Sequence, residues 1–244
     1  MYFSSLPVAE ALAVSVAFGS VAYALGTVSK SGFIGGVILG AAIYYSAGWG
    51  GFAVLGLFFI IGSGLTRLGY TRKAALGIAQ TDRGRRGASH ALANCAVGFF
   101  LALLYKLTGG NNLAGAAFVA SFATATADTA GTEAGSLYGR TAVLPVTFRR
   151  VPPGTPGAVS LQGTAAGIAG ALLLAFFGWL VGLVATVALA LTVAAAAFLS
   201  AWLESVLGSL PSVEKTLGNV GKNVLNTATG AVLCLILAKV LGLP

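Results

Sequence analysis

The chain has 244 residues, of which 57% are hydrophobic and 8% are charged, and its mean hydropathy is +0.91. Soluble domains carry about 25% charged residues, so this composition excludes an ordinary soluble fold and indicates an integral membrane protein. In such a protein the net charge of +8 indicates basic residues that set the orientation in the membrane and bind any anionic ligand, and it does not indicate nucleic-acid binding. The nearly unbroken apolar run over residues 171–201 lacks the alternation of barrel strands, so we expect an all-α, polytopic transmembrane helical bundle that forms one membrane domain over residues 1–244.

Apolar runs predict the membrane spans in chain order. They lie at about residues 6–28, 32–47, 49–65, 91–106, 112–127, 160–178, 180–201 and 223–241. The second, third and fifth runs are short for a bilayer that requires roughly 20 residues, so we expect about six to eight spans. The segment 134–147 is also apolar but contains Pro145, and it predicts a re-entrant piece or a short helix within a broken region near residues 128–160.

Small residues are abundant along these runs. The chain contains 35 glycines, which let transmembrane helices approach closely and therefore predict a compact bundle. The two cysteines, Cys95 and Cys234, both lie in apolar runs. We expect both to be buried free thiols.

The polar stretch Arg67–His90 predicts the orientation of the bundle. It contains six basic residues and one acidic residue, so the positive-inside rule places it in the cytoplasm. Counting spans from there puts the N-terminus, Asn111–Asn112 and the C-terminus outside, and Lys30 inside. Four polar clusters, at 82–94, 128–140, 149–164 and 204–226, then lie on one face. The sequence predicts a site on the cytoplasmic side of a prokaryotic plasma membrane, or of a thylakoid if the source is photosynthetic.

Three carboxylates, Asp128, Glu133 and Glu204, stand at the edges of apolar runs. Ionised groups cost at least about 2.5 kcal/mol at the bilayer centre, so they tend to be functional. Asp128 and Glu133 are separated by about 140° on an ideal helix, and both would reach one cation only if Gly131 broke the helix. Carboxylates with phosphate oxygens suit Mg²⁺. The alternative is that these residues cap helices or form interfacial salt bridges.

The segment VPPGTPGAVSLQGTAAG, residues 151–167, is a loop rich in proline and glycine that enters the apolar run at Leu161. Glycines let the backbone approach an anion, a helix N-terminus offers free N–H groups, and the preceding Arg149 and Arg150 add positive charge. Its hydroxyl residues are Thr155, Ser160 and Thr164. The loop therefore predicts phosphate binding, although no Gly-Lys-Ser/Thr of a Walker loop occurs. The alternative is an ordinary interhelical turn.

The segment DRGRRGASHALAN, residues 82–94, places three arginines, Arg83, Arg85 and Arg86, just before a span. These arginines would bind phosphate or anionic lipid headgroups, or only set orientation. His90 and Asn94 are four residues apart and share a helix face. His90 is the single histidine of the chain, and a lone histidine is more often structural or interfacial than catalytic.

The fourth polar cluster joins two apolar runs over residues 204–230. Glu204 and Ser205 end one run, and a polar group opens the next. This group consists of Lys222, Asn223, Asn226 and Thr227. The last three share a helix face, and polar side chains inside a membrane need another helix, water or a ligand as a partner. Plain hydrogen bonding between helices is the alternative.

Together, the segments ATADTAGTEAGSLYG, RRVPPGTPGAVSLQGTAAG, GRRGASHALAN, and ESVLG followed by KNVLNTATGA resemble the phytyl-phosphate kinase family of integral membrane proteins, formerly a family of unknown function. The resemblance covers nearly the whole chain. It implies transfer of a phosphoryl group from a nucleoside triphosphate, CTP by preference, to an isoprenyl monophosphate such as phytyl or geranylgeranyl phosphate.

Carried over position by position, the family pattern marks Asp128, Thr129, Glu133, Gly154, Thr155, Gly157, Ser160, Gly163, Asn94, Asn223 and Asn226. The chain departs from the pattern twice. His90 stands where the family usually has glutamine, which leaves its role open. Glu204–Ser205 stands where the family usually has Asp-Ser, and this change keeps a carboxylate.

We therefore expect a membrane-embedded isoprenyl-phosphate kinase of isoprenoid and tocopherol metabolism, with Mg²⁺ as cofactor. The expected metal ligands are Asp128, Glu133 and Glu204, and the expected catalytic residues are Asp128, Glu133 and Arg150. The expected nucleotide- and phosphate-binding residues are Arg85, Arg86, Asn94, Arg149, Gly154, Thr155, Gly157, Ser160, Gly163, Thr164, Asn223 and Asn226. The prenyl tail would lie among helices rich in small residues.

Two other functions remain open from the sequence. A lipid-phosphate nucleotidyltransferase would use much the same metal and phosphate groups. A transporter or channel would use Asp128 and Glu133 as ion ligands. Against a transporter, the sequence shows no convincing internal repeat, and its charges gather on one face instead of at the midplane.

Overall fold

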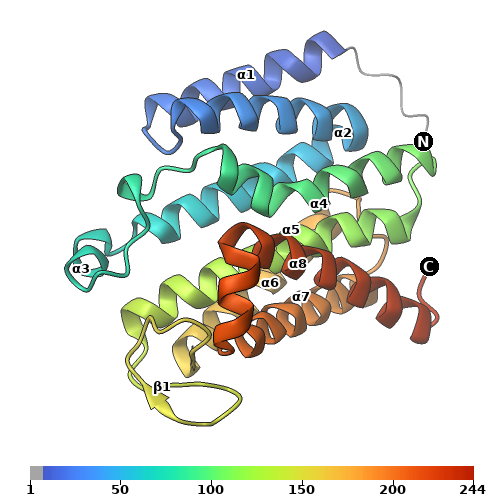
Figure 1. Cartoon of the computed structure of the whole chain (residues 1–244). Coiled ribbons are helices and arrows are strands. Elements are labelled where there is room, and N and C mark those ends of the chain that lie inside the picture. Colours follow the sequence, from blue (N-terminus) through green and yellow to red (C-terminus); the bar gives the residue numbers. More distant parts are fainter. Residues whose placement is uncertain (1–7) are drawn as a thin grey trace.

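The computed structural model describes residues 8–244, apart from the side chains of residues 211–215. The helices are α1 (Val8–Ala24), α2 (Lys30–Arg67), α3 (Tyr70–Ala75), the short 3₁₀ helix η1 (Asp82–Gly84), α4 (Ala88–Leu107), α5 (Asn112–Tyr138), α6 (Leu161–Leu180), α7 (Val187–Gly208) and α8 (Pro211–Val240). They pack into one helical bundle (Figure 1). Among residues 8–244, five helices are long and apolar enough to cross a membrane, namely α2, α4, α6, α7 and α8 from Thr216. The expected fold class is confirmed.

The predicted spans 32–47 and 49–65 are the two halves of α2. Gly48 interrupts the helix with φ 63° and ψ −162°, a left-handed φ that favours glycine. The chain turns back at this point (Figure 1), so a Cβ atom at Gly40 would lie 3.2 Å from the ring of Phe52. Tyr44 packs its ring against Trp49 across the turn and donates a hydrogen bond of 2.8 Å to Glu10 in α1. The first predicted span, 6–28, corresponds to α1, and its first two residues lie outside the described residues.

Helix α5 occupies the centre of the bundle and contacts α2, α4, α6, α7 and α8. Every residue from Ala114 to Ala127 is buried, as expected for a helix that is apolar on all sides. Small residues allow this close packing. A Cβ atom at Gly163 of α6 would lie 2.7 Å from the Gly131 carbonyl oxygen of α5, and one at Gly178 would lie 2.6 Å from Val119.

The region after residue 128 differs from the sequence expectation. Helix α5 continues without a break through Gly131 to Tyr138, so the expected break at Gly131 is wrong, and the chain leaves the helix only after Tyr138. Three two-residue strands follow instead: β1 (Ala142–Val143), β2 (Arg150–Val151) and β3 (Val159–Ser160). They form an antiparallel sheet in the order β2-β1-β3, with Ala142 opposite both Val151 and Ser160. Gly131 lies where α6 crosses α5, with a Cβ atom there 3.4 Å from the Gly163 carbonyl oxygen, and this packing needs no change of helix direction.

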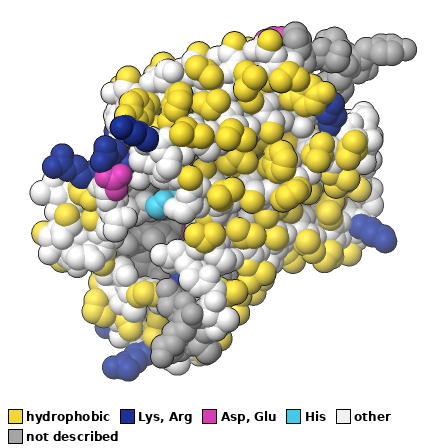
Figure 2. Space-filling view, turned by 45° about the horizontal axis from the view of Figure 1, so that its top comes forward, with side chains coloured by type: hydrophobic (Ala, Val, Ile, Leu, Met, Phe, Trp, Pro, Cys, Tyr) yellow, Lys and Arg dark blue, Asp and Glu magenta, His cyan; other side chains and the backbone are white. Residues whose placement is uncertain are grey.

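The two ends of the bundle differ. The start of α1 and the end of α8 lie at one end, whereas α3 and the β1 region lie at the other (Figure 1). Hydrophobic side chains cover most of the visible outer face, and most of the lysines and arginines lie toward its edges (Figure 2). This distribution suits a protein whose sides contact lipid and whose ends contact water.

Candidate active site

A cavity of about 760 Å³ lies at the end of the bundle that carries α3 and the small sheet. All four polar clusters of the sequence contribute to its lining. The sequence-predicted site residues that line it are Arg86, Asn94, Asp128, Glu133, Gly154, Thr155, Gly157, Ser160, Gly163, Thr164, Glu204 and Asn223, and His90, Thr129, Ser205 and Lys222 line it as well. Residues that are far apart in the sequence thus form one polar chamber among apolar helices.

Asp128 of α5 and Glu204 of α7 form the acidic centre of this cavity. Their carboxyl groups share a hydrogen bond, Thr132 also bonds to Asp128, and the charge of Lys222 acts on both carboxyl groups. Two ionised carboxylates repel each other, so such a contact requires a proton or a cation between them. The structure therefore brings two of the three expected metal ligands together, with a lysine beside them.

Asn226 holds Glu204 in place. Its side-chain nitrogen donates to Oε2 of Glu204. Ser200 in turn donates to both the carbonyl oxygen and Oδ1 of Asn226, each at 2.8 Å. Asn226 is buried and does not line the cavity, so it orients the carboxylate from behind the cavity wall.

Asn94 and Asn223 connect α4 and α8 in the wall of the cavity. The side chain of Asn94 donates to the backbone oxygen of His90 at 3.0 Å. Asn223 donates to Oδ1 of Asn94 at 3.3 Å. The first bond lies within α4 and the second joins α8 to α4. Both side chains also line the cavity, so hydrogen bonding between helices and contact with a ligand are compatible roles for Asn223.

The side chains of Glu133 and Asp128 project from the continuous helix α5 in different directions, so Glu133 has a different partner. Its Oε2 lies 2.5 Å from Nζ of Lys73, and both side chains are almost fully buried. Lys73 also donates to the backbone oxygens of Leu65 and Thr66, at 3.2 and 2.8 Å. In the sequence, Lys73 stands out only as one charge in a basic stretch. Its partner is 60 residues away in the sequence.

Arg86 is a buried arginine in the wall of the cavity, only 9% exposed. Its backbone is held by hydrogen bonds to Thr27 and Ser29, and its guanidinium lies 5.3 Å from the ring centre of Phe58. Its Nε atom has no hydrogen-bond partner among the described residues. Burial lowers the pKa of this guanidinium below its ordinary value. The structure thus provides a positive charge whose hydrogen-bonding capacity is not fully used.

The glycine-rich loop shows clear structural roles. Ser160 caps α6 by accepting a hydrogen bond of 3.2 Å from the Gly163 amide. Gly157 has φ +73°, and a Cβ atom there would lie 2.3 Å from the Ser209 amide nitrogen at the end of α7. The hydroxyl of Thr155 donates to the Pro152 oxygen. The loop lines the cavity as expected, but its glycines also serve packing and turn geometry.

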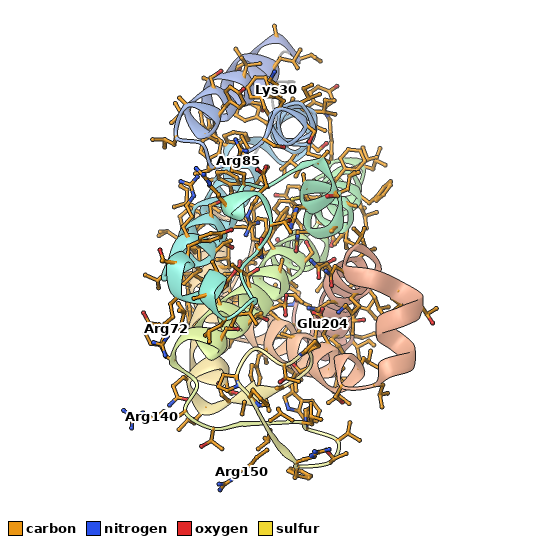
Figure 3. The ribbon with its side chains drawn as sticks, turned by 60° about the vertical axis from the view of Figure 1, so that its left-hand side comes forward. Lys30, Arg72, Arg85, Arg140, Arg150 and Glu204 are labelled. Carbon is orange, nitrogen blue, oxygen red and sulfur yellow. The ribbon has the colours of Figure 1, made fainter. Side chains whose placement is uncertain are left out.

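Three predicted arginines do not reach the cavity. Arg149 and Arg150 are exposed, and Arg150 points away from the bundle (Figure 3). Arg85 is exposed and pairs with Asp82 at 2.5 Å, and this bond raises the pKa of Arg85. The expected catalytic position of Arg150 and the expected phosphate contacts of Arg85 and Arg149 find no support in this geometry. By contrast, Glu204 lies between the helices in the same view (Figure 3).

The donor set of the cavity fits a magnesium ion that is bound together with phosphates. Among the residues that the structure describes, no three His, Cys, Asp or Glu side chains gather as a metal-binding group. Asp128 and Glu204 form a group of two in contact. Mg²⁺ is commonly held by one or two carboxylates, with water and substrate phosphates as its other ligands.

Comparison with known proteins places these features in a family. The chain is 34% identical over 218 residues to "Protein VTE6, chloroplastic" of Arabidopsis thaliana, an alignment that covers 86% of this chain and 65% of that protein. This chain therefore spans somewhat less than two thirds of the plant protein. It is 36% identical over 201 residues to an uncharacterized membrane protein of Synechocystis sp., covering 81% of this chain and 78% of the relative. It is 31% identical over 204 residues to an uncharacterized membrane protein of Methanocaldococcus jannaschii, covering 84% and 83%.

No solved structure matches the chain significantly. The family model described as "Integral membrane protein DUF92" matches residues 13–238. This match covers every helix that forms the cavity and confirms the family resemblance found in the sequence motifs. The chain belongs to the DUF92 family of integral membrane proteins.

Proposed function

We propose that the protein is a membrane-embedded kinase that transfers the terminal phosphoryl group of a nucleoside triphosphate to an isoprenyl monophosphate. The observation that carries the proposal is the pair of carboxyl groups of Asp128 and Glu204, which share one cavity with Lys222 and the buried Arg86. Phosphoryl transfer depends mainly on positioning and on electrostatic stabilisation, and these groups are suited to both. The motifs that resemble phytyl-phosphate kinases support the acceptor and the preference for CTP.

In the proposed reaction, an oxygen of the acceptor phosphate attacks the γ-phosphorus of the nucleotide. The bond between the γ-phosphorus and its bridging oxygen to the β-phosphate breaks, and the nucleoside diphosphate leaves with that electron pair. The attacking oxygen is already ionised at neutral pH. A strong general base is therefore not required, which suits a cavity whose single histidine is the half-buried His90.

The residues of the cavity would have distinct roles in this reaction. Asp128 and Glu204 would hold Mg²⁺, which, when bound, neutralises charge on the β- and γ-phosphate oxygens. Asn226 and Thr132 fix the directions of the two carboxylates. Lys222 and Arg86 contribute fixed positive charge toward the phosphates, and the surrounding apolar helices lower the dielectric constant and strengthen these interactions.

The test is analysis of the reaction products. Protein purified in detergent is incubated with Mg²⁺, geranylgeranyl or phytyl monophosphate, and CTP, ATP, GTP or UTP in separate reactions, and the products are read by mass spectrometry. We expect a prenyl diphosphate and a nucleoside diphosphate. A nucleotide-linked lipid with pyrophosphate would instead identify a nucleotidyltransferase. Unchanged nucleotide with every acceptor, from protein shown to be folded, would contradict the kinase and favour a transporter.

A further inference from the structure

A second hollow adjoins the cavity and is almost entirely apolar. It is a narrow groove of about 80 Å³ between α1, the two halves of α2 and the start of α4. Its aromatic walls are Phe18, Phe33, Phe52, Phe58 and Phe59. The absence of side chains at Gly36 and Gly56 keeps it open: a Cβ atom at Gly36 would meet no atom within 4 Å, and one at Gly56 would meet only the ring of Phe18, at 3.8 Å.

The groove and the polar cavity meet at two residues. Arg86 and His90 line both of them. The structure makes space for the guanidinium of Arg86 at this junction, because a Cβ atom at Gly62 would lie 2.3 Å from its Nη2 atom. The junction thus joins a buried cation, whose Nε lacks a partner among the described residues, to an apolar channel. A ligand that complements both parts has an anionic head and a hydrocarbon tail.

We propose that this groove binds the first isoprene units of the acceptor's tail and that Arg86 binds the acceptor's phosphate, an inference that rests on the proposed function. The acceptor would lie with its phosphate toward Asp128 and Glu204 in the cavity and its tail between α1, α2 and α4. From Gly32 to Gly40, both of which line the groove, α2 rises about 12 Å. This is the extended length of roughly two isoprene units, each of which adds four carbon–carbon bonds of about 1.5 Å. A longer tail would continue beyond Gly40 or leave the groove toward lipid beside the exposed Gly36.

The kinetic test fills the groove with one side chain. In Gly56→Leu, the added side chain occupies the space beside Phe18, and we expect the KM for geranylgeranyl monophosphate to rise about tenfold through lost apolar contact, with the KM for the nucleotide unchanged. The matched control is Gly64→Leu, on the same helix, exposed and outside the groove, where an added Cβ meets no atom within 4 Å. Adding Phe18→Ala to Gly56→Leu should restore the KM. If Gly56→Leu does not fold, Gly36→Leu gives the same readout. An unchanged KM in a folded groove variant would overturn the proposal.

A binding test separates this inference from the kinase proposal, because it requires no nucleotide and no turnover. A prenyl monophosphate with a photoreactive diazirine in its second isoprene unit is crosslinked to the protein, and the labelled residues are mapped by mass spectrometry. We expect label in α1, α2 and α4, lost with excess geranylgeranyl monophosphate and reduced in Gly56→Leu. Label in α6 and α7, or label that excess ligand does not displace, would overturn the groove assignment. Groove labelling without any diphosphate product would uphold the binding site and contradict the kinase.

Discussion

At the scale of single residues, the buried charges of the site differ in whether they already have a partner. Lys73 and Glu133 neutralise each other at 2.5 Å. Arg86 is buried beside Phe58 with an unused Nε donor, and Asp128 contacts another carboxyl group. A buried charge that is already neutralised by an opposite charge has less capacity to bind a ligand than one that is not. Because Lys73 already neutralises Glu133, whereas Asp128 lies against a second carboxyl group, we propose that Glu133 supports the wall of the cavity and that Asp128 and Glu204 hold the metal.

The pairing of Glu133 predicts a stability effect. Removing one partner of a buried ion pair leaves an uncompensated charge and costs about 3–5 kcal/mol. We therefore expect Glu133→Gln to lower the midpoint of thermal unfolding by about 10 °C, and the double variant Lys73→Met/Glu133→Gln to recover most of that loss. Asp82→Asn, at the exposed pair with Arg85, is the control and should shift stability by less than about 1 kcal/mol. Normal stability combined with weaker apparent Mg²⁺ affinity in Glu133→Gln would show a metal ligand instead.

At the scale of the elements, the crossing of α5 and α6 positions the acidic centre against the glycine-rich loop. The helices approach so closely at Gly131 and Gly163 that a Cβ atom at Gly163 would lie 2.7 Å from a backbone oxygen. The cap of α6 at Ser160 begins just before this crossing. The loop wall and Asp128 are therefore held at a fixed separation by backbone contact.

This crossing predicts the effect of one added methyl group. Gly163→Ala forces α6 away from α5, because the contacted atom belongs to the backbone and cannot rotate away. We expect a loss of about 1–3 kcal/mol in stability and a lower kcat, measured by thermal unfolding and by product formation. Gly64→Ala, at an open position on α2, is the control and should change neither quantity. Wild-type stability and kcat in Gly163→Ala would contradict the role of the crossing.

The elements also show what the sequence could and could not predict. Spans such as α4 and α6 follow from hydropathy, because a helix that crosses lipid must be apolar along its length. The sequence does not predict that α5 is continuous, because a glycine such as Gly131 is compatible with either a helix break or a close helix crossing. Only the position of Gly163 in the fold distinguishes the two. The pairing of Lys73 with Glu133 depends on how α2 and α3 pack against α5, and sequence spacing contains no signal for it. Convergence of the four polar clusters was predictable, because counting spans places them on one face.

At the scale of the whole molecule, the residues that line the cavity lie toward one end of the bundle. This end carries α3, the small sheet and the basic stretch after α2 (Figure 1). By the positive-inside rule, we propose that it faces the cytoplasm, where nucleoside triphosphates are available. The start of α5 lies at the opposite end.

Cysteine labelling tests this orientation. Cys95 and Cys234 are buried and free, so the wild-type protein should react little with a membrane-impermeant maleimide. We expect Asn112→Cys, at the exposed start of α5, to react in intact bacterial cells expressing the protein. Arg72→Cys, at an exposed position in α3, should react only after the membrane is permeabilised. The reverse pattern would place the cavity on the outer side.

The measurement that tests the central claim most directly follows the γ-phosphoryl group itself. A nucleotide labelled at its γ-phosphorus is incubated with geranylgeranyl monophosphate and wild type, Asp128→Asn, Glu204→Gln or the exposed control Asp82→Asn, with Mg²⁺ or with chelator. We predict that label enters the prenyl diphosphate with wild type and with Asp82→Asn, and that chelation or either cavity substitution lowers the rate by at least about a hundredfold, on the scale of a lost electrostatic catalytic group. Transfer at the wild-type rate by both folded cavity variants, or with chelator present, would contradict the account.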